Sequence, residues 1–313
     1  MPGEHLRIVF LGTAAFGVPA LEALVHSSHE VVGVVTAPEK PAGRGLKPTA
    51  SPIKLVAQQY RIPVWQPVKL KDPAFLAEMR ALQADLQVVV AFRMLPEVLW
   101  KLPPMGTINI HASLLPDYRG AAPIQWAIIN GETETGVTIF QLSHDIDTGD
   151  ILAQEKIPIL PGETAGELHD RLKQIGADLL MKTLDEMIHH QLQPIPQHLL
   201  IKPGMVLHAA PKIQKQDAQI QWHRTAKEIV QQILGMNPSP VAWTWLDGKM
   251  LRIFRAHVCA STHSTLAMPG SWDTDGKTYF RFAAADGWVE IDELQLEGRK
   301  RLPVQEFLKG FRR

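Results

Sequence analysis

The chain has 313 residues, with 45% hydrophobic and 20% charged side chains and 32 basic and 32 acidic residues. This composition is that of a globular protein and excludes disordered, collagen-like and coiled-coil chains. Because domains cluster near ~100–150 residues, the length predicts two domains. The single cysteine, Cys259, excludes a disulfide framework and a cysteine-based zinc site.

The two parts of the chain differ in charge. Residues 200–313 carry 16 basic and 11 acidic side chains, a net charge of +5, whereas residues 1–199 carry 16 and 21, a net charge of −5. A basic C-terminal part indicates a surface for a polyanion, although a functionless uneven spread of charge explains the numbers equally well. No apolar run reaches the ~20 residues of a membrane span, and the first strand follows Met1 closely, so we expect a cytoplasmic protein without a leader segment.

The first part alternates apolar strands with helical segments. We expect strands at 8–11, 31–35, 64–65, 86–92, 107–111 and 136–140, and helices at 19–25, 53–61, 75–82 and 122–130. Strands that are apolar on both faces belong in a parallel sheet covered by helices, which predicts a doubly wound, Rossmann-like α/β domain. The spacing of Thr164 and Glu167 is that of a capping box and predicts a long helix ending near His190. This helix closes a predicted first domain, residues 1–190.

The second part has a different pattern. Residues 191–211 contain four prolines and little periodicity, which predicts a linker. In residues 212–313, three Asp-Gly pairs separate short alternating runs, the strongest short-range signal for type I′ hairpins. We therefore predict a smaller C-terminal antiparallel β-barrel domain, OB-like, over residues 212–313.

The densest polar cluster lies around Asn109 and His111. Two residues apart on a strand, their side chains leave the same face, at the carboxyl end where open α/β sheets bind ligands. A second cluster contains Asp147 in an acidic turn that lacks the calcium-loop pattern. Together an amide, an imidazole and a carboxylate suit acyl or formyl transfer to a substrate amine. For Asn109 and His111 the alternative is a pair of hydrogen-bonded polar groups in the core. For Asp147 the alternative is an acidic surface turn.

Two further features concern ligands. The first strand is not followed by a G-x-G-x-x-G turn, and no phosphate-binding G-x-x-x-x-G-K-[ST] motif occurs, which argues against a dinucleotide or ATP site. The loop at 38–52 contains four prolines and two glycines, from which we expect no regular structure, and it carries Lys40, Arg44 and Lys47. Its length predicts a functional, mobile segment, with a surface loop of no function as the alternative.

These motifs resemble a known family. Residues 109–116, 118–123 and 147–150 resemble the signature of folate-dependent formyltransferases. The loop around Arg44, together with residues 212–222 and 237–244, narrows the resemblance to the methionyl-tRNA formyltransferases. The resemblance covers nearly the whole chain.

The resemblance implies 10-formyltetrahydrofolate as the formyl donor and initiator methionyl-tRNA as the acceptor. We also expect no metal, no membrane and a monomer. The resemblance implies that Asn109 is an oxyanion donor, that His111 stabilises charge or carries a proton, and that Asp147 holds His111. The residues that it assigns to folate are Ser113, Leu114, Leu115, Pro116, Phe92, Arg93 and Leu95, and those that it assigns to tRNA are Lys40, Arg44 and Lys47. Arg93 departs from the family pattern.

Two rival functions make different predictions. Formyl transfer to glycinamide ribonucleotide or to a sugar amine predicts neither a basic insertion nor a separate C-terminal barrel, and the sequence indicates both. A non-catalytic RNA-binding protein on the same fold predicts the loss of Asn109, His111 or Asp147, and all three are present.

Overall fold

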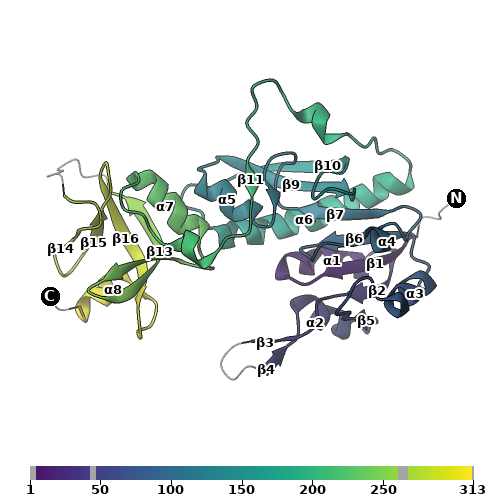
Figure 1. Ribbon diagram of the computed structural model, residues 1–313, viewed down its shortest axis with the longest axis horizontal. Coiled ribbons are helices and arrows are strands. Elements are labelled where there is room, and N and C mark those ends of the chain that lie inside the picture. The colour runs from purple at the N-terminus through teal and green to yellow at the C-terminus, as the bar shows by residue number, and fades with distance from the viewer. Residues whose placement is uncertain (1–4, 43–46, 260–266, 312–313) are drawn as a thin grey trace. The chain divides into compact units, whose positions relative to one another are not determined.

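The computed structural model describes residues 5–42, 47–259 and 267–311 (Figure 1). It divides into two compact units. The first is built from Met1–Arg119, Gly136–Ile157 and His169–Ala209, and the second from Gly120–Thr135, Pro158–Leu168 and Ala210–Arg313. The domain limits at 190 and 212 stay a prediction.

The first unit contains a seven-stranded sheet in the order β10-β9-β7-β6-β1-β2-β5. Its strands are β1 (Arg7–Gly12), β2 (Glu30–Val35), β5 (Val64–Trp65), β6 (Leu86–Val90), β7 (Thr107–His111), β9 (Glu134–Gln141) and β10 (Ile151–Pro158). The helices are α1 (Val18–Val25), α2 (Pro52–Gln59), α3 (Pro73–Ala81), α4 (Glu97–Trp100) and most of α6 (Ala165–Ile188). The chain also forms 3-10 helices at Ala15–Gly17, Gln197–Leu200 and Lys215–Ala218, and the two-residue strands β8 (Arg119–Gly120) and β11 (Ala209–Ala210).

The strand directions confirm the predicted sheet in part. Five strands that are neighbours in the sheet, in the order β7, β6, β1, β2 and β5, run parallel. Strand β9 is antiparallel to β7, which makes the sheet mixed. An apolar run buried on both faces has the same pattern in either direction, so its sequence does not reveal this reversal. Strand β10 was not predicted, because its exposed central residues break the apolar pattern.

Helices cover both faces of this sheet, as the doubly wound prediction requires. On one face Val9 packs in a cluster with Phe75 of α3 and Leu99 of α4. On the other face a Cβ at Gly17 would lie 3.2 Å from Phe10 and 3.3 Å from Ile53 of α2. Gly17, at the start of α1, therefore lies so close to the sheet that a larger side chain would require its neighbours to shift by a few tenths of an ångström.

The loop at 38–52 contains regular structure, so that part of the expectation is wrong. Its strands β3 (Lys40–Ala42) and β4 (Lys47–Thr49) pair antiparallel, with Pro41 opposite Pro48. Both strands of a two-stranded ribbon are edges, where a missing proline N–H can point outward without breaking the pairing. Arg44 lies outside the described residues.

The second unit contains an antiparallel half-barrel, which confirms the predicted C-terminal architecture. Its strands pair in the order β12-β13-β16-β15-β14, and β17 pairs with β16. The strands are β12 (Ala242–Leu246), β13 (Lys249–Val258), β14 (Trp272–Thr274), β15 (Phe280–Ala283), β16 (Trp288–Leu296) and β17 (Leu302–Pro303), and the helices are α5 (Pro123–Ile129), α7 (Ala226–Gly235) and α8 (Val304–Lys309). The fully buried Phe280 ring contacts several aromatic side chains of the core.

Only one of the three predicted type I′ turns has the required backbone. Asp247 and Gly248 between β12 and β13 have φ of 49° and 76°. At the second pair, Asp275 accepts hydrogen bonds from the backbone N–H groups of residues 277 and 278, which stabilises a longer loop. Gly287 of the third pair does not have a positive φ. Each Asp-Gly pair predicted the position of a turn but not the number of residues in it.

The predicted capping box is present at the start of α6. Glu167 accepts the Thr164 backbone N–H at 2.9 Å, and Thr164 Oγ1 accepts the Glu167 N–H at 3.3 Å. The bond from the Thr164 N–H is the largest cause that lowers the pKa of Glu167.

Among the described residues, none of the helices combines the length and apolar character needed to cross a bilayer.

Candidate active site

Asn109 and His111 lie on β7, an inner strand of the sheet. Asn109 is paired with Val89 of β6 and Phe140 of β9, and His111 is paired with Thr138. Because they are two residues apart on a regular strand, their side chains leave the same face, as predicted. Asn109 is half-buried, whereas His111 is 6% exposed.

His111 lies between two acceptor groups. Its Nε2 lies 3.0 Å from the Tyr118 carbonyl oxygen, and its Nδ1 lies 3.9 Å from Asp147 Oδ2. The first contact is a hydrogen bond, and the second is an ion-pair contact somewhat longer than one. Catalytic contacts in ligand-free proteins are often long and shorten when substrate binds. The structure therefore brings His111 and Asp147 together, although nothing in their sequence spacing requires it.

Asp147 occupies the loop between β9 and β10. The loop closes on itself, since the Gln141 N–H donates to the Asp150 carbonyl at 2.9 Å and Ser143 Oγ lies 2.9 Å from Thr148 Oγ1. The Asp147 side chain is 13% exposed, and its φ of 53° is unusual for a residue other than glycine. Such backbone conformations cluster at functional sites, where surrounding contacts maintain them.

The side-chain amide of Asn109 differs from these two groups in its partners. Within the part of the chain that the structure describes, it makes no hydrogen bond. The Asn109 side chain leaves the same face of the strand as His111, and its amide N–H groups can donate to an oxygen of a substrate. An unengaged amide beside an imidazole–carboxylate pair can stabilise an oxyanion while a proton is moved.

The residues predicted to contact folate after His111 are mostly buried. Ser113 is fully buried and its hydroxyl donates to the Asp117 carbonyl at 2.7 Å, and Leu115 packs with Phe140. Thr138 holds this segment, donating to the Ser113 carbonyl at 2.6 Å and accepting from the Leu115 N–H at 3.1 Å. Pro116 is buried, and Leu114 is half-buried. The segment fixes the loop that carries the Tyr118 carbonyl, and direct folate contact stays a prediction.

The second predicted folate segment follows β6. Phe92 and Leu95 are half-buried at the edge of the apolar cluster around Val89. Arg93 donates to the Val68 carbonyl at 2.9 Å and to the Pro67 carbonyl, and burial lowers its pKa. Arg93 therefore ties two loops together through backbone acceptors.

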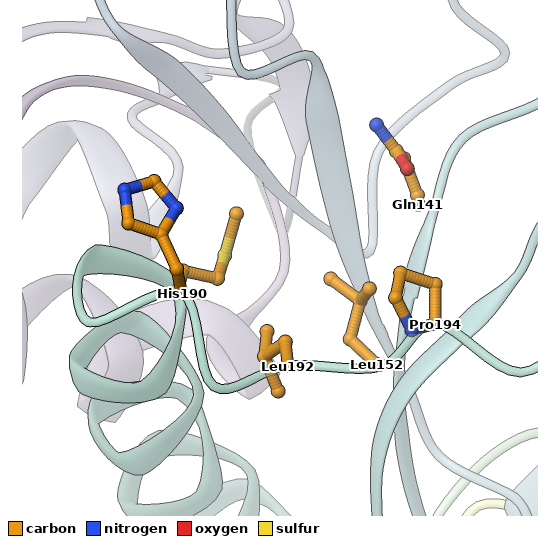
Figure 2. A pocket seen from close by; sticks show the side chains of 6 residues that line it. Gln141, Leu152, His190, Leu192 and Pro194 are labelled. Carbon is orange, nitrogen blue, oxygen red and sulfur yellow. The ribbon is translucent and has the colours of Figure 1, made fainter. Parts of the chain in front are cut away.

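Residues of the first unit also line a shallow hollow of about 310 Å³. It is lined by Gln141, Leu152, Met187, His190, Leu192 and Pro194. In Figure 2 the His190 ring and the Gln141 amide lie at the upper left and upper right, and Leu192, Leu152 and Pro194 lie below them. None of the predicted site residues lines it, so the candidate active site is defined by the contacts of His111.

Sequence reasoning missed two residues near Asp147. Gln197 donates to the carbonyls of the Asp147 loop and accepts from Arg119. Gln197 lies in the proline-rich stretch 191–211, which the sequence predicts to be a linker and where no periodicity predicts a buried position. Arg119 stands within the motif, but only the structure shows its partner.

Comparison with known proteins decides the family. Residues 6–184 match the formyl transferase family, and residues 212–312 match the formyl transferase C-terminal domain. The chain belongs to the formyl transferase family. Membership agrees with the contact between the His111 imidazole and the Asp147 carboxylate and with the unengaged amide of Asn109 two residues away on the same strand.

Curated members of the family are similar over almost the whole chain. The methionyl-tRNA formyltransferase of Bacteroides fragilis is 47% identical over 99% of this chain and 97% of its own length. That of Parabacteroides distasonis is 48% identical over 100% and 98%. A solved N-formyltransferase from Helicobacter canadensis, in complex with folinic acid and dTDP-3-aminofucose, matches the fold with a TM-score of 0.67. It is 19% identical and covers 95% of this chain and 100% of that one.

Proposed function

We propose that this chain transfers the formyl group of 10-formyltetrahydrofolate to the α-amine of methionyl initiator tRNA. The observation that carries the proposal is the contact of His111 with Asp147 beside the unengaged amide of Asn109. The full-length similarity to curated methionyl-tRNA formyltransferases supports the choice of substrates. A monomer acting in the cytoplasm is part of the same proposal.

The amine nitrogen attacks the formyl carbon and forms a C–N bond. The formyl oxygen becomes an oxyanion, and Asn109 donates a hydrogen bond to it. An oxyanion donor contributes about 3–4 kcal/mol to such a transition state. The bond from carbon to the folate nitrogen then breaks, and the proton lost by the amine is returned to that nitrogen, giving formyl-methionyl-tRNA and tetrahydrofolate.

His111 and Asp147 move this proton and stabilise the charge. The Tyr118 carbonyl occupies one ring nitrogen of His111, and the other faces the Asp147 carboxylate. A ring that carries two protons donates to both acceptors, so the pair stabilises the cationic form that accompanies the oxyanion. Asp147 keeps the imidazole oriented throughout.

A formyl-transfer assay with three acceptors tests this proposal. The full-length chain receives 10-formyltetrahydrofolate with a labelled formyl group and, in parallel, methionyl initiator tRNA, glycinamide ribonucleotide or a dTDP-amino sugar. We expect label on the tRNA and none on the small amines. Label on either small amine alone, or on no acceptor, would contradict the proposed substrate.

The C-terminal unit supplies unpaired positive charge for the tRNA backbone. Among the described residues, Arg299 and Lys300 form no ion pair, whereas Arg301 donates twice to Glu293. Arg301 is therefore largely neutralised. Lys40 and Lys47 of the β3–β4 hairpin, and Arg44 between them, are proposed to contact the acceptor end.

Neutralising the unpaired charges should reduce the salt dependence of tRNA binding. Each lost phosphate contact lowers the slope of log K against log salt concentration by about 1. The variant with Arg299→Gln and Lys300→Gln should show a slope smaller by about 1–2, measured by filter binding. The matched control, Glu293→Gln with Arg301→Gln, keeps the net charge and should keep the slope. If the two variants had equal slopes, Arg299 and Lys300 would not belong to the protein surface that binds tRNA.

A further inference from the structure

Gln197 is a buried glutamine whose side chain joins distant segments of the first unit. It is 3% exposed and lies in the 3-10 helix Gln197–Leu200. Its Nε2 donates to the carbonyl oxygens of Asp147 at 2.9 Å and Gly149 at 2.8 Å. The amide thus bridges the two residues on either side of Thr148.

Arg119 fixes which way this amide points. Arg119 Nε donates to Gln197 Oε1 at 3.1 Å, and a second guanidinium nitrogen donates to the same oxygen. A guanidinium can only donate and a carbonyl oxygen can only accept, so one amide orientation satisfies all four contacts. Reversing the amide would place donor against donor and acceptor against acceptor. Gln197 is therefore held as a donor toward the Asp147 loop.

Tyr118 and Arg119 are neighbours in the sequence, and each acts on one partner of the His111–Asp147 contact. The Tyr118 carbonyl accepts from His111, and Arg119 next to it reaches the Asp147 loop through Gln197. Tyr118 has a φ of 57° and Asp147 a φ of 53°, and surrounding contacts must maintain both conformations. Two consecutive residues thus set the imidazole and the carboxylate relative to each other.

We propose that Gln197, oriented by Arg119, is a positioning residue that holds Asp147 against His111 for formyl transfer. The inference rests on the proposed function, because it requires Asp147 to act in the reaction. Gln197 contacts backbone oxygens of the loop and does not touch the reacting atoms. It should therefore affect the chemical step more than the binding of either substrate.

The test is Gln197→Met in the full-length chain, which keeps the side-chain size and removes the amide. A displacement of about 1 Å at a catalytic group can cost about 100-fold in rate, so we expect kcat to fall about 10- to 100-fold. The KM values for 10-formyltetrahydrofolate and methionyl-tRNA should stay within about two-fold. In a background of Asp147→Asn, the same change should add less than about two-fold, since the two residues act through one contact.

Gln232 provides a matched control. It is 4% exposed in the C-terminal unit, and its Nε2 donates to the carbonyls of Asp217 at 2.8 Å and Gln219 at 3.2 Å. Gln232→Met removes the same type of bridge between residues two apart, and it should leave kcat unchanged. A thermal melt of both variants separates lost stability from lost positioning.

The outcomes distinguish the inference from the function on which it rests. If Asp147→Asn keeps full activity, the proposed role of Asp147 fails. If Asp147→Asn is inactive while Gln197→Met has the kcat of the unchanged protein, the positioning role is wrong. Equal losses of kcat in Gln197→Met and Gln232→Met would also overturn it, because the effect would then be general instability.

Discussion

Asn109→Ala should lower the turnover number by at least about 100-fold, because removing one oxyanion donor costs about 100- to 1,000-fold. The side-chain amide has no hydrogen-bond partner within the described residues, so its loss leaves no buried group unsatisfied. The fold should survive, and the melting temperature should change little. Single-turnover formylation of methionyl-tRNA, with folding followed by circular dichroism, measures both quantities.

A control for this change is Asn237→Ala in the C-terminal unit. Asn237 is buried and its Nδ2 donates to the Phe254 carbonyl at 2.8 Å, so its removal leaves an acceptor unpaired. A buried unpaired group costs about 1–3 kcal/mol, and this variant should therefore lose stability while keeping its rate constant for formyl transfer. Near-normal turnover in Asn109→Ala would refute the assigned role.

The sequence predicted the central strands because their patterns carry strong physical signals. Residues 86–90 and 107–111 are buried along almost their whole length, and Asn109 and His111 lie two residues apart between the isoleucines of the second strand. The presence of polar side chains in such a strand needs an explanation, and ligand binding provides one. The same argument located Asp147 only as part of an acidic turn, since no local pattern encodes its approach to His111.

The features that escaped prediction depend on contacts distant in the sequence. The antiparallel direction of β9 and the burial of Gln197 leave no local pattern, because each is determined by its packing partners. The 191–211 stretch lacks periodicity, yet Gln197 within it bonds to the loop of Asp147. The predicted domain limit at 190 would separate these two residues, so a fragment ending there should lose activity even if it folds.

Gly149→Ala tests how closely the Asp147 loop is packed. A Cβ at Gly149 would lie 1.6 Å from the Gln141 carbonyl oxygen, which belongs to β9 and cannot move independently of the sheet. The loop must therefore shift, and with it the Gly149 carbonyl that accepts from Gln197. We expect a loss of about 1–3 kcal/mol in the free energy of unfolding and about 100-fold in kcat.

Gly287→Ala is the matched control for this substitution. Neither glycine has a positive φ, and a Cβ at Gly287 would meet no atom within 4 Å. The two changes therefore differ in available space, and Gly287→Ala should alter the free energy of unfolding by no more than about 0.5 kcal/mol and leave kcat unchanged. Urea denaturation and single-turnover formylation measure the two effects. Normal kcat in Gly149→Ala would mean that Asp147 tolerates displacement of its loop, and tight positioning of the carboxylate would then not be required for formyl transfer.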